Sequence, residues 1–351
     1  MSVARIRLAP DYEISRVIRG GWQLADDHSG NKSDAPLEDM LAYADQGIDT
    51  FDCADIYTGV EELIGRFRAF YRDRRGAEAL VHLHVHTKFV PDIDVLGSID
   101  KAYVTGVIER SLQRLGMERL DLVQFHWWDY GVDRWLETAG WLDELRGEGK
   151  IHKVSGTNFD TAHVEAILAA GVPLTSLQVQ YSVLDQRPGR SLADLAARHG
   201  VVLLCYGTVA GGFIGERWLG VPEPGAGLEN RSLTKYKLII DDIGGWAVFQ
   251  DLLATLARVA TRHGVDIATI ASAYVLTLPA VAAVIVGARN RTHLEGNLAV
   301  SAITLDDRDL GEIAAAIGAQ APLAGDVYAL ERDRTGRHGA VMKYNLNKGP
   351  E

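Results

Sequence analysis

Short apolar runs alternate with longer amphipathic stretches along this chain, and that alternation limits the possible folds more than any other feature. Strands are predicted at 15–21, 48–52, 81–88, 120–126, 153–158, 176–180, 201–207 and 283–288. Helices are predicted near 36–46, 60–74, 98–115, 133–148, 160–170, 189–199, 246–264 and 267–277. Alternating strands and helices predict a parallel sheet with right-handed crossovers. Eight such units predict an α/β fold with one closed (β/α)8 barrel, the TIM barrel.

The alternative is an open, doubly wound sheet, which usually carries a glycine-rich dinucleotide fingerprint after its first strand. The first predicted strand instead ends in Gly20-Gly21-Trp22, without that fingerprint. Two segments stand outside the repeat, a long loop after the seventh strand (208–245) and a C-terminal tail (318–351). No low-complexity linker separates them from the rest, so residues 1–351 are expected to form a single domain.

Composition argues against several classes of function. The formal net charge is −11, whereas a protein that binds nucleic acid needs a basic face. No run approaches the ~20 apolar residues of a membrane-spanning helix, and the first ten residues lack the apolar segment of a signal peptide. Cys53 and Cys205 lie in apolar runs, where free cysteines are usually buried. We therefore expect a cytoplasmic protein without nucleic-acid or membrane partners.

Polar, titratable residues gather at the ends of successive strands. Asp52 ends the second strand, Tyr57 follows in the next loop, Lys88 ends the third strand and His126 ends the fourth. Taken singly, each residue has an ordinary explanation. An aspartate can cap a helix, a tyrosine can pack in the core, a lysine can be solvated and a histidine can be buried. Because the carboxyl ends of barrel strands form the catalytic face, the four together predict an active site.

These residue types suit the reduction of a carbonyl group, which needs a hydride on carbon and a proton on oxygen. Tyr57 can supply the proton, since tyrosine normally keeps its proton at neutral pH. A nearby Lys88 would lower the pKa of Tyr57, and Asp52 would keep Lys88 charged despite burial. His126 would donate a hydrogen bond to the substrate oxygen and orient it.

A metal-dependent hydrolase is the weaker chemical alternative. The HLHVH run (82–86) offers histidines, but no matching carboxylates accompany them. A metal site is therefore not expected.

Several motifs resemble, in order, those of the aldo-keto reductase family. GIDTFDCADIYTGVEELIG (47–65) is similar to the family's G-x-x-x-F-D-T-A-x-x-Y-G signature, and HTKF (86–89) and LVQFHWWD (122–129) carry the remaining tetrad positions. The resemblance continues through KVSGTNFD (153–160), LQVQYSVLD (177–185), YGTVAGGFIG (206–215) and AVIVGARNRTHLEGNL (283–298). It covers about residues 15–300 and implies that Asp52, Tyr57, Lys88 and His126 are catalytic.

The resemblance also implies a nicotinamide dinucleotide stretched across the barrel mouth. Thr157, Asn158 and Gln178 would hold its carboxamide, and Tyr206 would stack under its ring. The 208–245 loop would fold over it as a clasp, with Arg231 reaching a phosphate. The full set expected to bind the cofactor is Gly21, Trp22, Asp52, Thr157, Asn158, Gln178, Tyr206, Gly207, Thr208, Ala210, Gly211, Arg231, Gly287, Ala288, Arg289, His293 and Asn297.

Arg289 would clamp the 2′-phosphate of NADP, so NADP is the expected cofactor and NAD the alternative. Two positions depart from the family's adenosine segment. His293 stands where Gln or Arg is common, and Gly296 precedes Asn297 where the family usually has Glu. The contacts to adenine therefore stay open.

Aromatic residues near the tetrad predict an apolar pocket for a small-molecule substrate. Its expected lining is Trp22, Tyr57, Phe89, His126 and Trp127, with Trp128 beside them. The tail either closes over the substrate, as it often does in the family, or forms a surface strap or a subunit contact. Aldehydes, ketones, sugars and the corresponding alcohols all remain open as substrates.

Two functions follow from these observations. The first is an NADP(H)-dependent oxidoreductase in which Tyr57 is the general acid and base. The second is a regulatory subunit that binds the cofactor without turnover, resembling the potassium-channel β-subunits. The sequence indicates no oligomeric state.

Overall fold

The computed structural model describes residues 3–25, 33–225 and 227–347. Residue 226 of the expected clasp and residues 348–351 of the tail lie outside the described residues. Eight parallel strands form a closed barrel in the spatial order β10-β3-β4-β5-β6-β7-β8-β9, which confirms the predicted (β/α)8 fold. The strands are β3 (Val17–Gly20), β4 (Thr50–Asp52), β5 (His84–Phe89), β6 (Leu120–Phe125), β7 (Ile151–Thr157), β8 (Leu174–Gln180), β9 (Val202–Tyr206) and β10 (Val281–Gly287).

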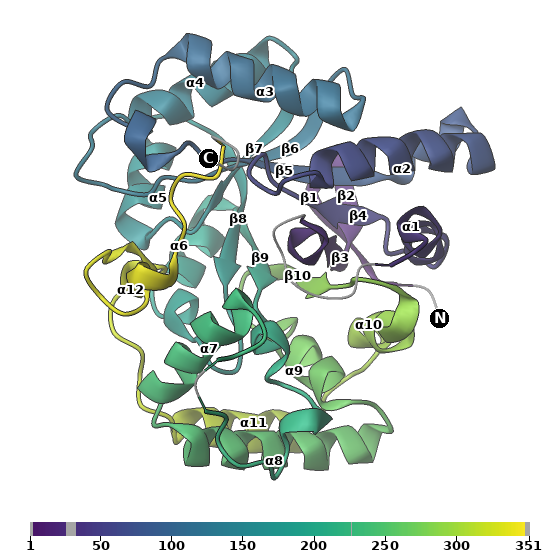
Figure 1. The fold of residues 1–351 in the computed structure, drawn as a ribbon, viewed down its shortest axis with the longest axis vertical. Helices are drawn as coiled ribbons and strands as arrows, with labels where there is room; N and C mark the ends of the chain where they lie inside the picture. Colours follow the sequence, from purple (N-terminus) through teal and green to yellow (C-terminus); the bar gives the residue numbers. More distant parts are fainter. Residues whose placement is uncertain (1–2, 26–32, 226, 348–351) are drawn as a thin grey trace.

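Helices surround the barrel (Figure 1). All eight predicted helices are present within a few residues of their expected ends, and three of them begin at an aspartate cap. Asp100, Asp160 and Asp266 each accept a hydrogen bond from a backbone N–H in the first turn. The helices are α1 (Pro36–Asp45), α2 (Val60–Arg75), α3 (Lys101–Leu115), α4 (Trp135–Gly147), α5 (Thr161–Ala169), α6 (Leu192–His199), α8 (Trp246–His263) and α9 (Ile267–Val275).

An antiparallel hairpin that the sequence analysis missed precedes the barrel. Its strands are β1 (Arg5–Ala9) and β2 (Tyr12–Ser15). Leu8 and Ile14 of the hairpin pack with Leu122 of the barrel. The Tyr12 hydroxyl lies 3.1 Å from His86 Nε2, so the HLHVH run packs against this hairpin. The hairpin therefore closes the amino-terminal end of the barrel, away from the predicted site.

The long loop and the tail are present, and both contain helices. The 208–245 segment carries α7 (Arg231–Asp242), which Asn230 caps. After β10 come α10 (Leu294–Val300), α11 (Asp307–Gly318) and the short α12 (Ala329–Arg332). Helices α7, α8, α9 and α11 share a second apolar cluster that includes Ile239, Phe249 and Ile313. In Figure 1 the yellow C-terminal segment runs from α12 back across the barrel.

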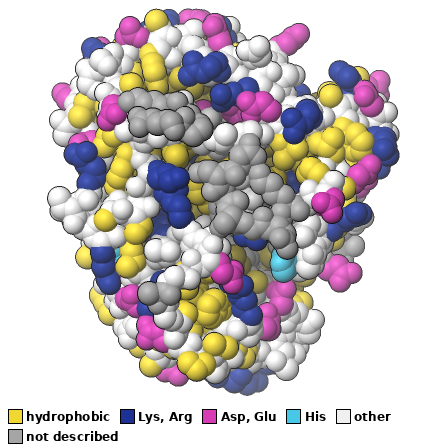
Figure 2. Space-filling model, in the orientation of Figure 1, with side chains coloured by type: hydrophobic (Ala, Val, Ile, Leu, Met, Phe, Trp, Pro, Cys, Tyr) yellow, Lys and Arg dark blue, Asp and Glu magenta, His cyan; other side chains and the backbone are white. Residues whose placement is uncertain are grey.

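Four general findings bear on function. Among the described helices, none is long and apolar enough to cross a membrane. Within the same part of the chain, no group of His, Cys, Asp and Glu side chains is placed to hold a metal ion. Cys53 and Cys205 are buried free thiols, as their apolar surroundings predicted. Figure 2 shows acidic and basic side chains interspersed over one face of the molecule.

Candidate active site

A cavity of about 280 Å³ lies among the segments that follow the carboxyl-terminal ends of the strands. Asp52, Tyr57, Lys88 and His126 all line it. The parallel register explains their proximity: Asp52 pairs with His86 on β5, and Lys88 lies two residues further along that strand. The structure thus brings the four predicted residues together.

Lys88 is held by a buried ion pair. Its Nζ donates to Asp52 Oδ2 at 2.7 Å and to the Cys53 carbonyl oxygen at 2.7 Å. Burial works against the ammonium, but Asp52 and Tyr57 outweigh it and raise the pKa of Lys88. Lys88 is therefore charged at neutral pH, and its predicted contact with Asp52 is confirmed.

The other oxygen of Asp52 has two partners. Gln124 Nε2 donates to Asp52 Oδ1 at 2.8 Å, and Gln178 Nε2 donates to it at 2.6 Å. Gln178, expected at the cofactor carboxamide, also lines the cavity, whereas Gln124 was not singled out from the sequence. A polar residue within the apolar run at the end of β6 was the available signal. The two amides fix the carboxylate that holds Lys88.

Tyr57 lies between Lys88 and Trp22. The Lys88 Nζ is 4.9 Å from the centroid of the Tyr57 ring, and the Trp22 ring meets Tyr57 edge-on at 5.0 Å. Burial raises the pKa of Tyr57, and the charge of Lys88 opposes this shift without reversing it. The expected net lowering is therefore wrong. Tyr57 keeps its proton at neutral pH, which is the form that can protonate a substrate oxygen.

His126 follows β6, and its ring is buried. Nδ1 lies 3.2 Å from the carbonyl oxygen of Thr157 at the end of β7. Because a carbonyl oxygen only accepts hydrogen bonds, Nδ1 must carry the proton. Burial, together with the charges of Arg332 and Lys88, lowers the pKa of His126 to about 3. The ring is then neutral with Nε2 as an acceptor, which contradicts the expectation that His126 donates to the substrate oxygen.

Asn158 and Tyr206 meet across the barrel mouth. Asn158 follows β7 with a φ of 60°, a left-handed conformation that asparagine tolerates better than most residues. Its Oδ1 accepts a hydrogen bond from the Tyr206 hydroxyl at 2.9 Å. Thr157, Asn158 and Tyr206 all line the cavity. The residues expected around a nicotinamide ring therefore converge.

Helix α7 packs closely on the loop that follows β9. A Cβ at Gly207 would collide with the Tyr236 hydroxyl, and one at Gly211 would lie 3.1 Å from Ser232. Both glycines have positive φ. From the other side, Trp22 Nε1 donates to Ser232 Oγ at 3.3 Å. Glycine at 207 and 211 therefore allows α7 to lie over this part of the mouth.

The remaining residues expected in the phosphate region fall into two groups. Thr208 and Arg231 line the cavity, and Arg231 Nη2 also donates to the Val341 carbonyl oxygen at 3.2 Å. Gly21 and Ala210 do not line the cavity. The Gly21 N–H donates to the Asp52 carbonyl oxygen, while Ala210 is buried behind the loop.

Of the cofactor residues expected at the end of β10 and after it, only the last residue of the strand reaches the cavity. Gly287 lines the cavity. Ala288 is buried, and its carbonyl oxygen accepts from Arg19 Nη2 at 3.0 Å. Arg289 is half-buried and His293 is exposed.

Position 296 is glycine in this chain, where the family usually has glutamate, and the packing around it is tight. A Cβ there would lie 3.0 Å from Asp266 Oδ2, the carboxylate that caps α9. The next residue, Asn297, donates from Nδ2 to the Tyr43 hydroxyl at 3.1 Å. A side chain at 296 would therefore require Asp266 and Thr269 to shift.

Two residues expected in the pocket wall lie outside it. Phe89 packs on Phe125 with ring centroids 6.0 Å apart, and Trp127 donates from Nε1 to the Asp129 carbonyl oxygen at 2.9 Å. Both are completely buried. Successive residues of a strand point to opposite faces, so Phe89 is directed away from the cavity that Lys88 lines. The prediction that Phe89 and Trp127 line the pocket is wrong, whereas Trp22, Tyr57, His126 and Trp128 do line it.

The tail completes the wall. It is tied down near β5, where Ile93 N–H donates to the Tyr344 carbonyl oxygen at 2.9 Å and Asn347 Nδ2 donates to the Val90 carbonyl oxygen at 2.8 Å. Of the alternatives left open for the tail, this position fits closure over a substrate better than a surface strap. Its lining residues are Tyr328, Val341, Met342, Lys343 and Leu346.

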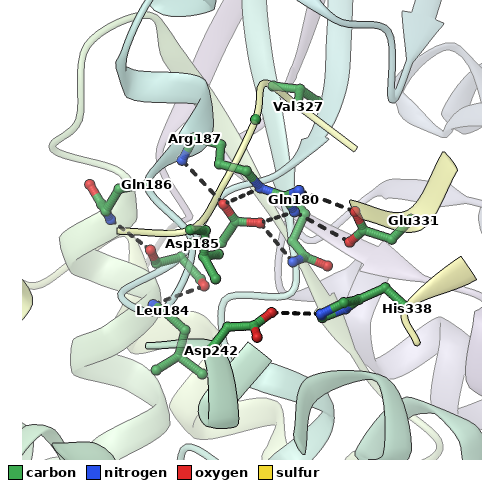
Figure 3. Close-up of polar contacts among 12 residues, drawn as sticks. Gln180, Leu184, Asp185, Gln186, Arg187, Asp242, Val327, Glu331 and His338 are labelled. Atoms are coloured by element: carbon green, nitrogen blue, oxygen red, sulfur yellow. Dashed lines mark hydrogen bonds and ion pairs between the residues drawn. The ribbon is translucent and has the colours of Figure 1, made fainter. Parts of the chain in front are cut away.

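A buried ion network anchors α12 beneath this wall (Figure 3). Arg187 Nη2 donates to Asp185 Oδ2 at 2.7 Å, and its Nη1 donates to Glu331 Oε2 at 3.2 Å. Lys235 Nζ of α7 lies 3.7 Å from Glu331 Oε1. Burial would raise the pKa of Glu331, but Lys235 and Arg187 lower it instead. The Glu331 carboxylate is therefore charged and joins the tail to α7 and to the loop after β8.

A parallel eight-stranded barrel with a polar site at its carboxyl-terminal end defines the class of (β/α)8-barrel proteins. Within that class, the Aldo/keto reductase family model matches residues 16–317, and the chain belongs to that family.

The sequence identity to the following individual relatives is below 30%. Flagellar radial spoke protein 5 of Chlamydomonas reinhardtii is 28% identical over 254 residues, which cover 62% of this chain and 47% of that protein. The NADH-specific methylglyoxal reductase of Escherichia coli (strain K12) is 27% identical over 206 residues, covering 58% of this chain and 60% of that protein. The match thus spans about half to three-fifths of these relatives' lengths. A glycerol dehydrogenase from Gluconobacter oxydans superposes with a TM-score of 0.75 at 24% identity, covering 93% of this chain and 98% of that one, which shows the shared fold.

Proposed function

We propose that this protein is an NADP(H)-dependent oxidoreductase that reduces an aldehyde, ketone or sugar carbonyl, or oxidises the corresponding alcohol. The observation that carries the proposal is a protonated Tyr57 beside a charged Lys88 in the wall of one cavity. Tyr57 would act as the general acid in reduction and as the base in oxidation. Lys88, held by Asp52, would stabilise the tyrosinate left after proton transfer.

The residues around the cavity fit a nicotinamide dinucleotide, which would supply or accept the hydride when bound. Asn158 and Gln178 offer the donors and acceptors that a carboxamide needs, and Tyr206 offers a flat ring. Gly207, Thr208 and Gly211 line the cavity after β9, where phosphates would lie, and Arg231 adds a positive charge. Arg289 favours NADP over NAD, although one relative is NADH-specific by name.

The walls would keep water from the reacting atoms. Trp22, Trp128 and Tyr328 surround the tetrad with aromatic surface. In such a site the charge that develops on the substrate oxygen interacts more strongly with Tyr57 and Lys88 than it would in water. Two buried free thiols are consistent with the reducing cytoplasm as the place of action.

A second candidate is a subunit that binds the cofactor without turnover, similar to the potassium-channel β-subunits. The observation that favours it is a relative whose name describes a component of the flagellar radial spoke. An intact tetrad fits either role, because binding and turnover use the same cavity.

The decisive test measures NADPH and NADH consumption with a panel of aldehydes, ketones and sugars, and the reverse reaction with alcohols. The wild type and Tyr57→Phe are compared, with cofactor binding followed separately by fluorescence. Turnover that depends on Tyr57 is the expected result. A protein that binds NADPH tightly but turns over no member of the panel would favour the regulatory role.

A further inference from the structure

We propose that Lys235 selects the redox form of the cofactor. Its ammonium, at the cavity wall beside Tyr206, disfavours the cationic nicotinamide of NADP⁺ relative to the neutral ring of NADPH. The protein then takes up the reduced cofactor and releases the oxidised one. This inference rests on the proposed function of the cavity, and it concerns a residue that the sequence analysis did not single out.

Lys235 lies on α7, the helix that covers part of the barrel mouth. It lines the same cavity as Tyr57 and Tyr206. Its Nζ is 5.3 Å from the centroid of the Tyr206 ring, the ring expected to stack on the nicotinamide. The charge of Lys235 therefore acts on the part of the cavity where the charge of the cofactor changes during the reaction.

Aromatic rings surround the Lys235 ammonium. Besides the ring of Tyr206, Nζ lies over the rings of Tyr236 and Tyr328, 5.5 Å from each centroid. The face of an aromatic ring carries partial negative charge and stabilises a cation. The three rings belong to β9, to α7 and to the tail. Contacts with three segments of the chain thus fix the position of this ammonium.

The buried ion network presents the Lys235 ammonium to the cavity. Nζ lies 3.7 Å from Glu331 Oε1, and Glu331 also accepts from Arg187, which pairs with Asp185 (Figure 3). The Lys235 side chain is 15% exposed, whereas the other three side chains are at most 1% exposed. Among the described residues that line the cavity, only Lys235 comes from this network. A bound molecule therefore meets the positive end of the network.

The same network keeps Lys235 protonated. Burial lowers the pKa of Lys235, and Arg187 adds to this shift, whereas Glu331 and Asp185 oppose it. The three tyrosine rings also favour the ammonium. Because a deprotonated Lys235 would leave the Glu331 carboxylate with Arg187 as its remaining counter-charge in the network, the charged form is favoured at neutral pH.

Reduction of a carbonyl group moves a hydride from the reduced nicotinamide to the carbonyl carbon and a proton from Tyr57 to the carbonyl oxygen. The nicotinamide ring is neutral before this step and carries one positive charge after it. A fixed ammonium repels the ring only in its oxidised form, so Lys235 weakens the binding of NADP⁺ more than that of NADPH. From a mixture of both forms, the protein would load the reduced cofactor.

Comparing the two redox forms isolates this effect. NADPH and NADP⁺ share the same phosphates, riboses and adenine. A contact between Lys235 and a phosphate, or a general loosening of the cavity, would therefore change both affinities alike. Two unit charges ~10 Å apart in a partly buried site change an affinity by roughly tenfold. Since Glu331 offsets part of the charge of Lys235, we expect an effect of about fivefold on the ratio of the two affinities.

The experiment measures the dissociation constants of NADPH and NADP⁺ by calorimetry for wild type, Lys235→Met and Lys235→Arg, with Lys237→Met as the matched control. Lys237 lies on the same helix, but it pairs with Glu223 at 2.6 Å and is not among the described residues that line the cavity. We expect the wild type to bind NADPH more tightly than NADP⁺. This preference should fall about fivefold in Lys235→Met and persist in Lys235→Arg and Lys237→Met.

Two results would overturn the proposal. The first is a wild type that binds NADP⁺ as tightly as NADPH or more tightly, and this result needs no variant. The second is a Lys235→Met variant with an unchanged ratio of the two dissociation constants, even where both affinities fall. NADH and NAD⁺ are expected to show the same change of ratio, because their nicotinamide rings carry the same charges.

The binding measurements also separate this inference from the proposed activity. A protein that shows the expected ratios but reduces no carbonyl compound lacks the proposed activity and retains the effect of Lys235. Turnover that depends on Tyr57, together with a ratio that Lys235→Met leaves unchanged, refutes the effect of Lys235 alone. Absence of binding by either cofactor would refute both.

Discussion

The Lys88 ammonium lies 2.7 Å from Asp52 Oδ2 with both side chains almost completely buried, at 6% and 5% exposed. Two strands that are neighbours in the barrel supply the pair, and the amides of Gln124 and Gln178 satisfy the remaining carboxylate oxygen. A buried charge is tolerated only while its counter-charge is present. The stability of the barrel mouth and the charge state of the candidate site are thus tied to the same contact.

Replacing Asp52 with Asn keeps the shape of the side chain but removes the counter-charge of Lys88. We expect this variant to lose ~3–5 kcal/mol of unfolding free energy, measured by urea denaturation. The double variant Asp52→Asn/Lys88→Met should recover part of the loss, because no unpaired charge remains. A single variant as stable as the wild type would show that Lys88 finds another partner.

Tyr57→Phe removes the proposed proton donor and keeps the ring between Trp22 and Lys88. We expect turnover to fall by ~10²–10⁴-fold, the usual contribution of a general acid or base. Cofactor affinity, measured by fluorescence quenching, should change little because the packing is retained. Near wild-type turnover in this variant would remove Tyr57 from its assigned role.

Arg289→Ala tests the choice of cofactor. A guanidinium can make charge-assisted hydrogen bonds to the 2′-phosphate of NADP, each contributing ~1.5–3 kcal/mol, and gains little from the hydroxyl of NAD. We expect about a tenfold or larger loss of NADP affinity, with NAD affinity unchanged. Arg291→Ala is the matched control, because Arg291 pairs with Asp39 on α1. Equal affinities of the wild type for both cofactors would discard the NADP preference and leave the proposed chemistry intact.

Arg332→Met tests the electrostatic surroundings of His126. Arg332 is one of the charges that hold the pKa of His126 at about 3, so its removal should raise that pKa towards the ~6.5 of a free imidazole. The acidic limb of the pH–rate profile should move to higher pH in parallel. Arg334→Met is the control, since Arg334 pairs with Asp129 at the surface. Identical NMR titrations of His126 in both variants would contradict the assignment.

The lowered pKa of His86 predicts how the free energy of unfolding depends on pH. Burial, with the charges of His84 and Lys88, lowers the pKa of His86 to about 3, whereas the unfolded chain takes up this proton near pH ~6.5. The unfolded state then binds more protons, so the free energy of unfolding falls as the pH drops below 6.5. The loss from this group is on the order of 2 kcal/mol at about pH 5.

Chemical denaturation between pH 7 and pH 5 checks this prediction. His86→Gln cannot titrate and should show a shallower dependence on pH than the wild type. His199→Gln replaces an exposed histidine of α6 and should leave the slope unchanged. Parallel slopes for the wild type and His86→Gln would refute the linkage.

The barrel was predictable because apolar runs and amphipathic stretches alternate eight times along the chain. The apolar run that became β10 and the helix that became α8 each carry a clear signal. The N-terminal hairpin was missed because its strands (RIRLA and YEIS) mix charged with apolar residues and lie outside the repeat of alternating strands and helices. Its signals were the alternation over Arg5–Leu8 and the turn at Pro10-Asp11.

The candidate site was predictable where it depends on strand ends. Asp52 ends β4 and Lys88 is the penultimate residue of the neighbouring β5, so their contact follows from the register. Side chains alternate between the two faces of a strand, so Phe89 must point away from the cavity if Lys88 points into it. The prediction that Phe89 lines the pocket overlooked this alternation. Arg332 was out of reach, because its partner Trp127 lies 205 residues away and no local pattern links them.

The sequence of the tail, which lines part of the cavity, can change in evolution independently of the sequence of the barrel. The family model ends at residue 317, whereas Tyr328, Glu331 and Met342 all come later in the chain. No barrel strand includes these tail residues, so the tail can diverge without breaking the closure of the sheet. Members of the family can therefore keep the barrel and its candidate site while they differ in the tail that lines the cavity.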